Sequence, residues 1–160
     1  MPRFDDARAL AETLLAVQRP QDWLRAQHVA IRARELSELP GVDRDPLMIA
    51  AVLHGIGRSP VVARTGFAPL DAARFLDVRG YDTRIVALVA HHAGAAHGAA
   101  ERGSDLDRYP DEATPTRDAL WYCDVTTGPD GEPVVPVTAL EVVRAAVTRT
   151  AALRSGMPAS

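Results

Sequence analysis

Proline and glycine divide this chain into short segments in which apolar residues recur at intervals of three and four positions. This pattern constrains the fold more than any other feature, because such spacing gathers apolar side chains on one face of an α-helix. The most strand-like run, Val134 to Val137, contains Pro136, and proline is poorly tolerated inside a sheet. The sequence therefore predicts an all-α fold, a single bundle of seven or eight helices.

Capping residues and helix breakers locate these helices. The expected ranges are 7–18, 23–39, 47–53, 69–76, 83–92, a short helix over 95–102, a helix that starts at Thr114 or Thr116, and a last helix to about residue 153 that opens with the capping box Thr138-Ala139-Leu140-Glu141. Nothing in the sequence resembles a linker between two domains. We expect one domain over residues 1–153 and a frayed tail over 154–160.

Charge and composition exclude several classes of protein. The formal net charge of −3 argues against a nucleic-acid binder, which normally carries a basic surface. The sequence contains no run of about 18 apolar residues, so we expect no membrane span. The first six residues are partly acidic and lack an apolar signal core, which favours a cytoplasmic location. The strongly apolar helices are compatible with a homodimer.

Histidines and one aspartate are the candidates for chemistry. His28 falls inside the second expected helix, His54 follows the apolar helix 47–53, and the adjacent His91 and His92 end the helix 83–92. Asp124 falls in an otherwise apolar helical turn, where an unpaired carboxylate would be costly to bury. Imidazole and carboxylate ligands suit a divalent ion such as Mn, Fe, Co, Ni, Mg or Zn. The sequence therefore indicates a metal site between helices.

These residues resemble a known family. The order His28, then His54-Gly55-Ile56-Gly57, then His91-His92, then Asp124 is similar to the HD-domain superfamily of metal-dependent phosphohydrolases. The resemblance covers about residues 21–145. It implies an HD-like helical bundle in which His28, His54 and Asp124 hold one divalent metal ion, and a small phosphorylated molecule such as a nucleotide as substrate.

The chain also departs from the family pattern. Gly55 stands where the family has its signature aspartate, and Ala68 stands where two-metal members have a histidine. Arg58 is a candidate for holding a substrate phosphate. His91 and His92 point about 100° apart on a helix, so only one can face a given site, and we favour His91 as a catalytic or second-site residue.

The sequence leaves three functions open. The first is a metal-dependent phosphohydrolase with weakened or lost activity, because two expected ligands are missing. The second is a non-catalytic HD-fold module that binds a small molecule or a protein. The third is redirected iron-dependent chemistry, which ranks last because the bridging carboxylate it needs is replaced by Gly55.

Overall fold

The chain is all-α in the computed structural model, which describes residues 3–103 and 105–156. The described residues form α1 (Phe4–Leu15), α2 (Pro20–Leu36), α3 (Arg44–Leu53), the 3-10 helix η1 (Ile56–Arg58), α4 (Ala68–Val78), α5 (Thr83–Ala90), the 3-10 helix η2 (His92–Gly94), α6 (Ala95–Glu101), α7 (Pro115–Val125) and α8 (Glu141–Arg154). The predicted fold class is confirmed. Of the predicted frayed tail, residues 157–160 lie outside the described residues.

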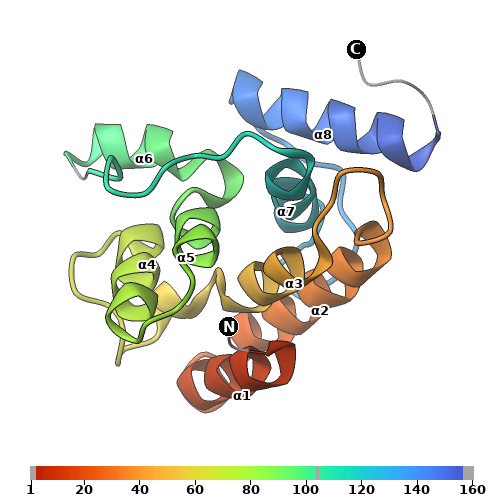
Figure 1. Ribbon diagram of the computed structural model, residues 1–160. Helices are drawn as coiled ribbons and strands as arrows, with labels where there is room; N and C mark the ends of the chain where they lie inside the picture. Colours follow the sequence, from red (N-terminus) through yellow and green to blue (C-terminus); the bar gives the residue numbers. More distant parts are fainter. Residues whose placement is uncertain (1–2, 104, 157–160) are drawn as a thin grey trace.

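Helix α3 lies in the middle of the bundle. Every residue from Leu47 to Leu53 is buried, as expected for a helix that is apolar on all sides. Helices α1, α2, α5 and α7 all pack against it, and Figure 1 shows them around it. The end of α3, where His54 follows, is therefore held at the centre of the molecule.

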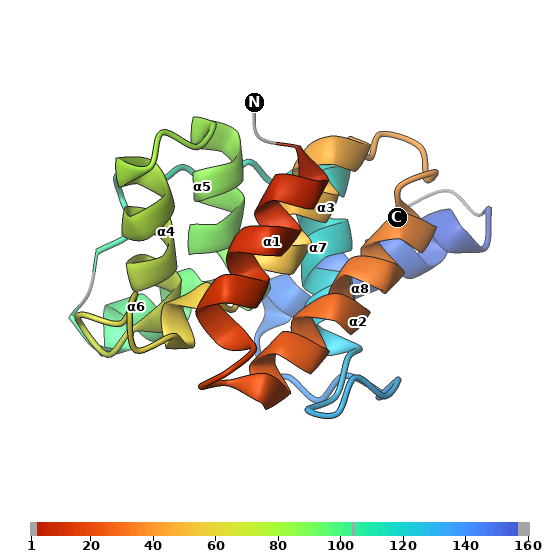
Figure 2. The same cartoon turned by 90° about the horizontal axis from the view of Figure 1, so that it is seen from below.

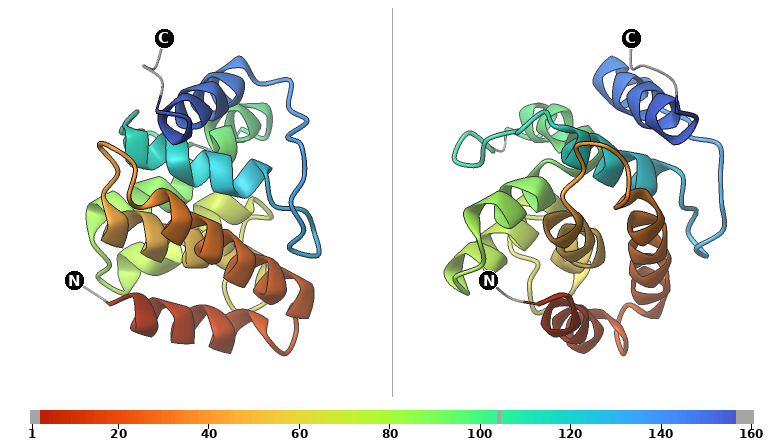
Figure 3. Two further views of the ribbon diagram at one scale, coloured as in Figure 1. Left: turned by 90° about the vertical axis from the view of Figure 1, so that its right-hand side faces the viewer. Right: turned by 45° about the vertical axis from the view of Figure 1, so that its right-hand side comes forward.

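The other helices flank this centre. Helices α4 and α5 pack together on one side, and Figure 2 shows them beside α1 and α3. On the other side α8 packs on α7, and the 126–140 segment that joins them runs along the side of the molecule (Figure 3). None of the helices in the described residues has the length and apolar character that crossing a membrane requires.

Polar caps set two of the helix starts, and a third expectation was wrong. Asp82 accepts a hydrogen bond from a first-turn backbone N–H of α5, and Thr114 caps α7 in the same way. The expected capping box at Thr138 does not form: its hydroxyl accepts from the backbone N–H of Leu140, and α8 begins only at Glu141. The hydroxyl is engaged by a local turn before the helix starts.

A close backbone contact fixes the turn after α3. A Cβ atom on Gly57 would lie 1.9 Å from the backbone oxygen of Ala68, so only glycine lets η1 pack against the start of α4. A Cβ atom on Gly55 would meet no atom within 4 Å, and the φ of Gly55 is −92°, which any residue adopts. The backbone conformation at position 55 therefore does not require glycine, and the missing side chain leaves open space there.

Candidate functional site

A cavity of about 330 Å³ lies where the ends of α3 and α7 meet the first turns of α2. We call it the inner pocket. Its lining residues are Asp22, Arg25, Ala26, His54, Gly55, Arg58, Ala68, His92 and Asp124. Six of these nine residues carry ionisable side chains and the other three are glycine or alanine, which makes this a polar cavity for the centre of a bundle.

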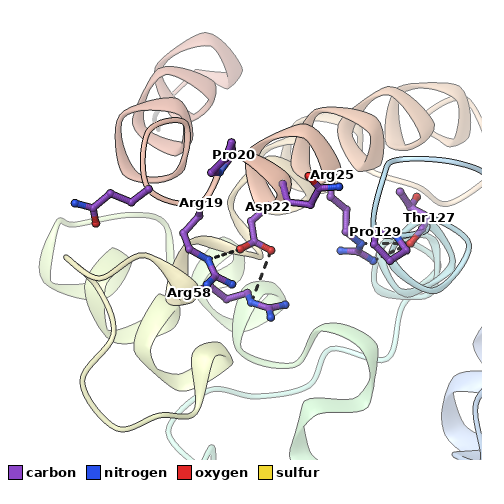
Figure 4. Close-up of a pocket in the computed structure, with 9 residues that line it drawn as sticks. Arg19, Pro20, Asp22, Arg25, Arg58, Thr127 and Pro129 are labelled. Atoms are coloured by element: carbon purple, nitrogen blue, oxygen red, sulfur yellow. Dashed lines mark hydrogen bonds and ion pairs between the residues drawn. The ribbon is translucent and has the colours of Figure 1, made fainter.

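A second cavity of about 660 Å³, the outer pocket, adjoins the first. The two share Asp22, Arg25 and Arg58, so they lie side by side, and we call them together the joined pockets. The remaining lining residues of the outer pocket are Gln18, Arg19, Pro20, Gln21, Thr127 and Pro129. Figure 4 shows the arginines and Asp22 of this pocket between the start of α2 and the turn at Pro129.

Arg25, His54 and Asp124 form a compact triad at the base of the inner pocket. Oδ1 of Asp124 lies 2.7 Å from Nη2 of Arg25 and 3.3 Å from Nε2 of His54. Nη1 of Arg25 lies 3.2 Å from the same Nε2. Nδ1 of His54 lies 2.6 Å from the backbone oxygen of Ala51, so we assign its hydrogen to Nδ1.

Backbone oxygens at the end of α7 also hold Arg25. Its Nη2 donates to the backbone oxygen of Asp124 at 2.6 Å, and both Nη2 and Nε donate to that of Thr127 at 3.1 and 3.3 Å. The last carbonyl groups of a helix lack their usual helical partners, and Arg25 supplies donors to two oxygens at this end. The side chain thereby ties α2 to the end of α7.

The electrostatics of the inner pocket favour an ionised Asp124. Burial opposes its ionisation, but His54, His92 and Arg25 outweigh burial and hold the pKa of the carboxyl group well below its ordinary value. Burial lowers the pKa of the His92 imidazole, and Nδ1 of His92 lies 2.7 Å from the backbone oxygen of Val89. The site therefore pairs one fixed carboxylate with imidazoles oriented by the backbone.

The mouth of the site carries excess positive charge. Asp22 contacts Arg19 at 2.6 Å and Nε of Arg58 at 3.7 Å, and the side chain of Arg58 is 58% exposed. Across both pockets, three arginines (Arg19, Arg25 and Arg58) face two aspartates (Asp22 and Asp124). Three positive and two negative charges leave one positive charge uncompensated, which suits an anionic ligand.

The structure brings most of the predicted residues together. His54, His92, Asp124 and Arg58 line the inner pocket, as do Gly55 and Ala68 at the two positions where ligands were expected. His28 does not join them. Its ring packs on the turn after α7, where a Cβ atom on Gly131 would lie 2.3 Å from its Cδ2. The expected trio of His28, His54 and Asp124 is thus replaced by Arg25, His54 and Asp124.

The structure places His92, and not the favoured His91, at the inner pocket. His91 is buried, and its Nε2 lies 2.5 Å from the backbone oxygen of Tyr109. It lines a different cavity, together with Leu106 and Asp107. Helix α5 ends at Ala90, so the two histidines diverge after it, and His92 is the one that reaches the inner pocket.

Sequence reasoning missed Arg25. It lies three positions before His28 on α2, so the two side chains project only about 60° apart on one helix. The apolar face of α2 does not distinguish them, because both border it. One signal was available: Asp124 is a carboxylate in an apolar segment, and such a group needs a cationic partner when it is buried. The chain has 18 arginines, however, so the sequence did not show which of them is that partner.

The residues of the inner pocket do not fit a divalent metal ion. Oδ1 of Asp124 and Nε2 of His54 both contact the Arg25 guanidinium, which would repel a second cation. Gly55 and Ala68 supply no ligand. Within residues 3–103 and 105–156, no three His, Cys, Asp or Glu side chains gather as a metal-binding group.

Comparison of the chain with protein-family models, with curated proteins and with solved structures finds no match. The likeness to the HD-domain superfamily therefore stays a prediction from the sequence motifs. The geometry of the pocket carries the functional argument.

Proposed function

We propose that the two joined pockets bind a small phosphorylated molecule, and that the chain is a binding module of HD-like fold that does not depend on a metal ion. The observation that carries this proposal is the excess of arginine over aspartate in the joined pockets. Guanidinium groups bind phosphate through paired, charge-assisted hydrogen bonds, which are among the strongest hydrogen bonds in proteins.

Arg58 is the residue best placed for first contact with the ligand. Its closest carboxylate contact, to Asp22, is 3.7 Å long, and more than half of the side chain is exposed. The guanidinium therefore keeps donors for a ligand. Arg25 is already engaged by Asp124, so it contributes charge more than new hydrogen bonds. A cavity of about 330 Å³ behind Arg58 is large enough for a phosphate group and part of its ester.

A metal-dependent phosphohydrolase is the second candidate. His54 and His92 each have Nδ1 close to a backbone oxygen, the arrangement that orients imidazole ligands in metal sites. Against this candidate, Arg25 contacts the groups that a metal ion would need. Phosphatase assays with and without added Mn²⁺ separate the two candidates, because only the hydrolase gains activity with the metal.

Titration calorimetry with inorganic phosphate, pyrophosphate and a nucleoside monophosphate tests the proposal. We expect saturable binding of at least one of these probes to the wild-type protein, and weaker binding to Arg58→Gln. Loss of one charge-assisted hydrogen bond corresponds to a weakening of about tenfold or more.

Arg108→Gln is the matched control, because Arg108 is also exposed and pairs with one aspartate, Asp77, at 3.3 Å, but does not line the joined pockets. It should leave the Kd unchanged. Equal weakening of binding in both variants would mean that the effect comes from the overall surface charge, and it would contradict a specific binding site. Absence of binding for all three probes would also reject the proposal.

A further inference from the structure

We propose that Arg25 is a built-in cation that neutralises Asp124 and closes the inner pocket to divalent metal ions. The proposal concerns the base of the pocket and does not depend on which anion enters at the mouth. It starts from the disagreement between the ligand set implied by the HD resemblance and the residues that line the pocket.

Arg25 occupies the place where a metal ion would bind at the base of the inner pocket. Arg25 places its guanidinium between the carboxylate of Asp124 and Nε2 of His54, at 2.7 and 3.2 Å. These are two of the groups in the pocket whose lone pairs a metal ion would need, and the His92 imidazole is a third. A metal ion at this place would have to displace the guanidinium or lie beside it, and two cations at such a distance repel each other strongly in a partly buried site.

Arg25 is held firmly in this position by several acceptors. Besides Asp124 and His54, it donates to two backbone oxygens at the end of α7, those of Asp124 and Thr127. Displacing it would remove its hydrogen bonds to these acceptors and to Asp124 Oδ1, and buried polar groups that lose a donor are costly. The planar fork of five N–H donors matches this set of acceptors, whereas a lysine would offer a single point of charge.

Gly55 leaves open space in the pocket where the HD resemblance implies a carboxylate ligand. Position 55 tolerates a side chain, since a Cβ atom there meets nothing within 4 Å and its backbone is ordinary. The backbone therefore does not require glycine at the position where the family has its aspartate. Glycine there adds no carboxylate that could balance the charge of a metal ion beside Arg25.

Thermal unfolding of Arg25→Ala with and without Mn²⁺ or Co²⁺ tests the proposal. The variant leaves the Asp124 carboxylate beside two imidazoles and an empty volume. We expect the melting temperature to fall without metal and to recover by about 5 °C or more with excess metal, while that of the wild-type protein does not respond.

Arg32→Ala is the matched control. Arg32 lies two turns further along α2 and also bonds to the turn after α7, through Thr127 Oγ1 at 2.6 Å and the backbone oxygen of Gly131 at 3.2 Å. It should lower the melting temperature without any recovery in metal. Recovery in Arg32→Ala equal to that in Arg25→Ala would overturn the proposal, as would a comparable metal response of the wild-type protein.

If Arg25→Ala does not fold, the double variant Arg25→His with Gly55→Asp provides the readout. It replaces the cation with an imidazole and adds a carboxylate in open space. We expect it to bind about one Co²⁺ per chain with visible absorption bands of the bound ion, and the wild-type protein to show none. Bands in the wild-type protein that Asp124→Asn removes would overturn the proposal, and so would a folded double variant without bands.

Discussion

The two ends of α7 each carry a buried aspartate paired with an arginine, yet they differ in what surrounds the pair. At the N-terminal end both oxygens of Asp118 bond to Arg149, at 2.7 and 3.1 Å. At the C-terminal end a single oxygen of Asp124 contacts both Arg25 and His54, beside a pocket that reaches solvent. The first pair joins α7 to α8, whereas the second borders space for a ligand.

This comparison shows that residue types alone do not mark a functional site. Arg117, next to Asp118, is almost fully buried with its guanidinium 4.0 Å from the centre of the Trp121 ring. Such packing fills the N-terminal end with side chains. The C-terminal end has Gly55 and Ala68 instead, and these small residues keep the inner pocket open. Open space next to paired charges is what separates the candidate site from a structural ion pair.

The largest expected effect is on folding stability at both ends of α7. Asp124→Asn and Asp118→Asn each leave a partly buried arginine without its carboxylate, so each should lower the free energy of unfolding by about 3 kcal/mol. Only Asp124→Asn should change phosphate binding, and we expect tighter binding because it removes a negative charge from the pocket. Urea unfolding and calorimetry on both variants measure these effects.

An equal change of phosphate affinity in both variants would break the distinction between the two ends. The stability measurement serves as the internal control, since both substitutions are expected to cost a similar amount. If the two variants lose similar stability but differ in phosphate affinity, the difference in affinity comes from the position of Asp124 in the inner pocket.

A smaller effect is expected when the open space in the inner pocket is filled. Gly55→Asp adds a carboxylate where a Cβ atom meets no neighbour, so stability should change little. Phosphate binding should weaken by about tenfold, or roughly 1.4 kcal/mol, because a negative charge now faces the anion. Gly55→Asn is the matched control, with nearly the same volume and no charge. Equal weakening of phosphate binding in both variants would mean that side-chain volume, and not charge, causes the effect.

The smallest expected effect concerns another ion pair, close to the N-terminal end of α7. Both oxygens of Glu112 bond to Arg84 at 2.9 Å. Burial opposes ionisation of Glu112, but Arg84 and Thr114 outweigh it and lower the pKa of the carboxyl group below its ordinary value of 4.5. A lowered pKa in the folded state gives stability that is present above pH 4.5 and is lost as the pH falls below it.

Urea unfolding as a function of pH measures this contribution. Glu112→Gln should lower stability at pH 7 by about 1 kcal/mol and should lose part of the acid dependence of the wild-type protein. Phosphate binding should not change, because Glu112 does not line the joined pockets. An unchanged acid dependence in the variant would contradict the structural role of this pair.

The helices were more predictable from the sequence than the site was. Asp82 and the choice between Thr114 and Thr116 located helix starts because capping depends on local hydrogen bonds. His54 and Asp124 could be chosen because each is a polar residue in an apolar segment that becomes buried. Periodicity could not tell Arg25 from His28, since both border the same face of α2, and their roles depend on how α7 ends.

Phosphate titration in excess EDTA tests the central claim of a metal-independent anion site most directly. The wild-type protein should bind phosphate or a phosphate ester with the same Kd in EDTA and in excess Mn²⁺, because Arg25 and Arg58 supply the positive charge of the pocket. Binding that disappears in EDTA and returns with Mn²⁺ would contradict the account.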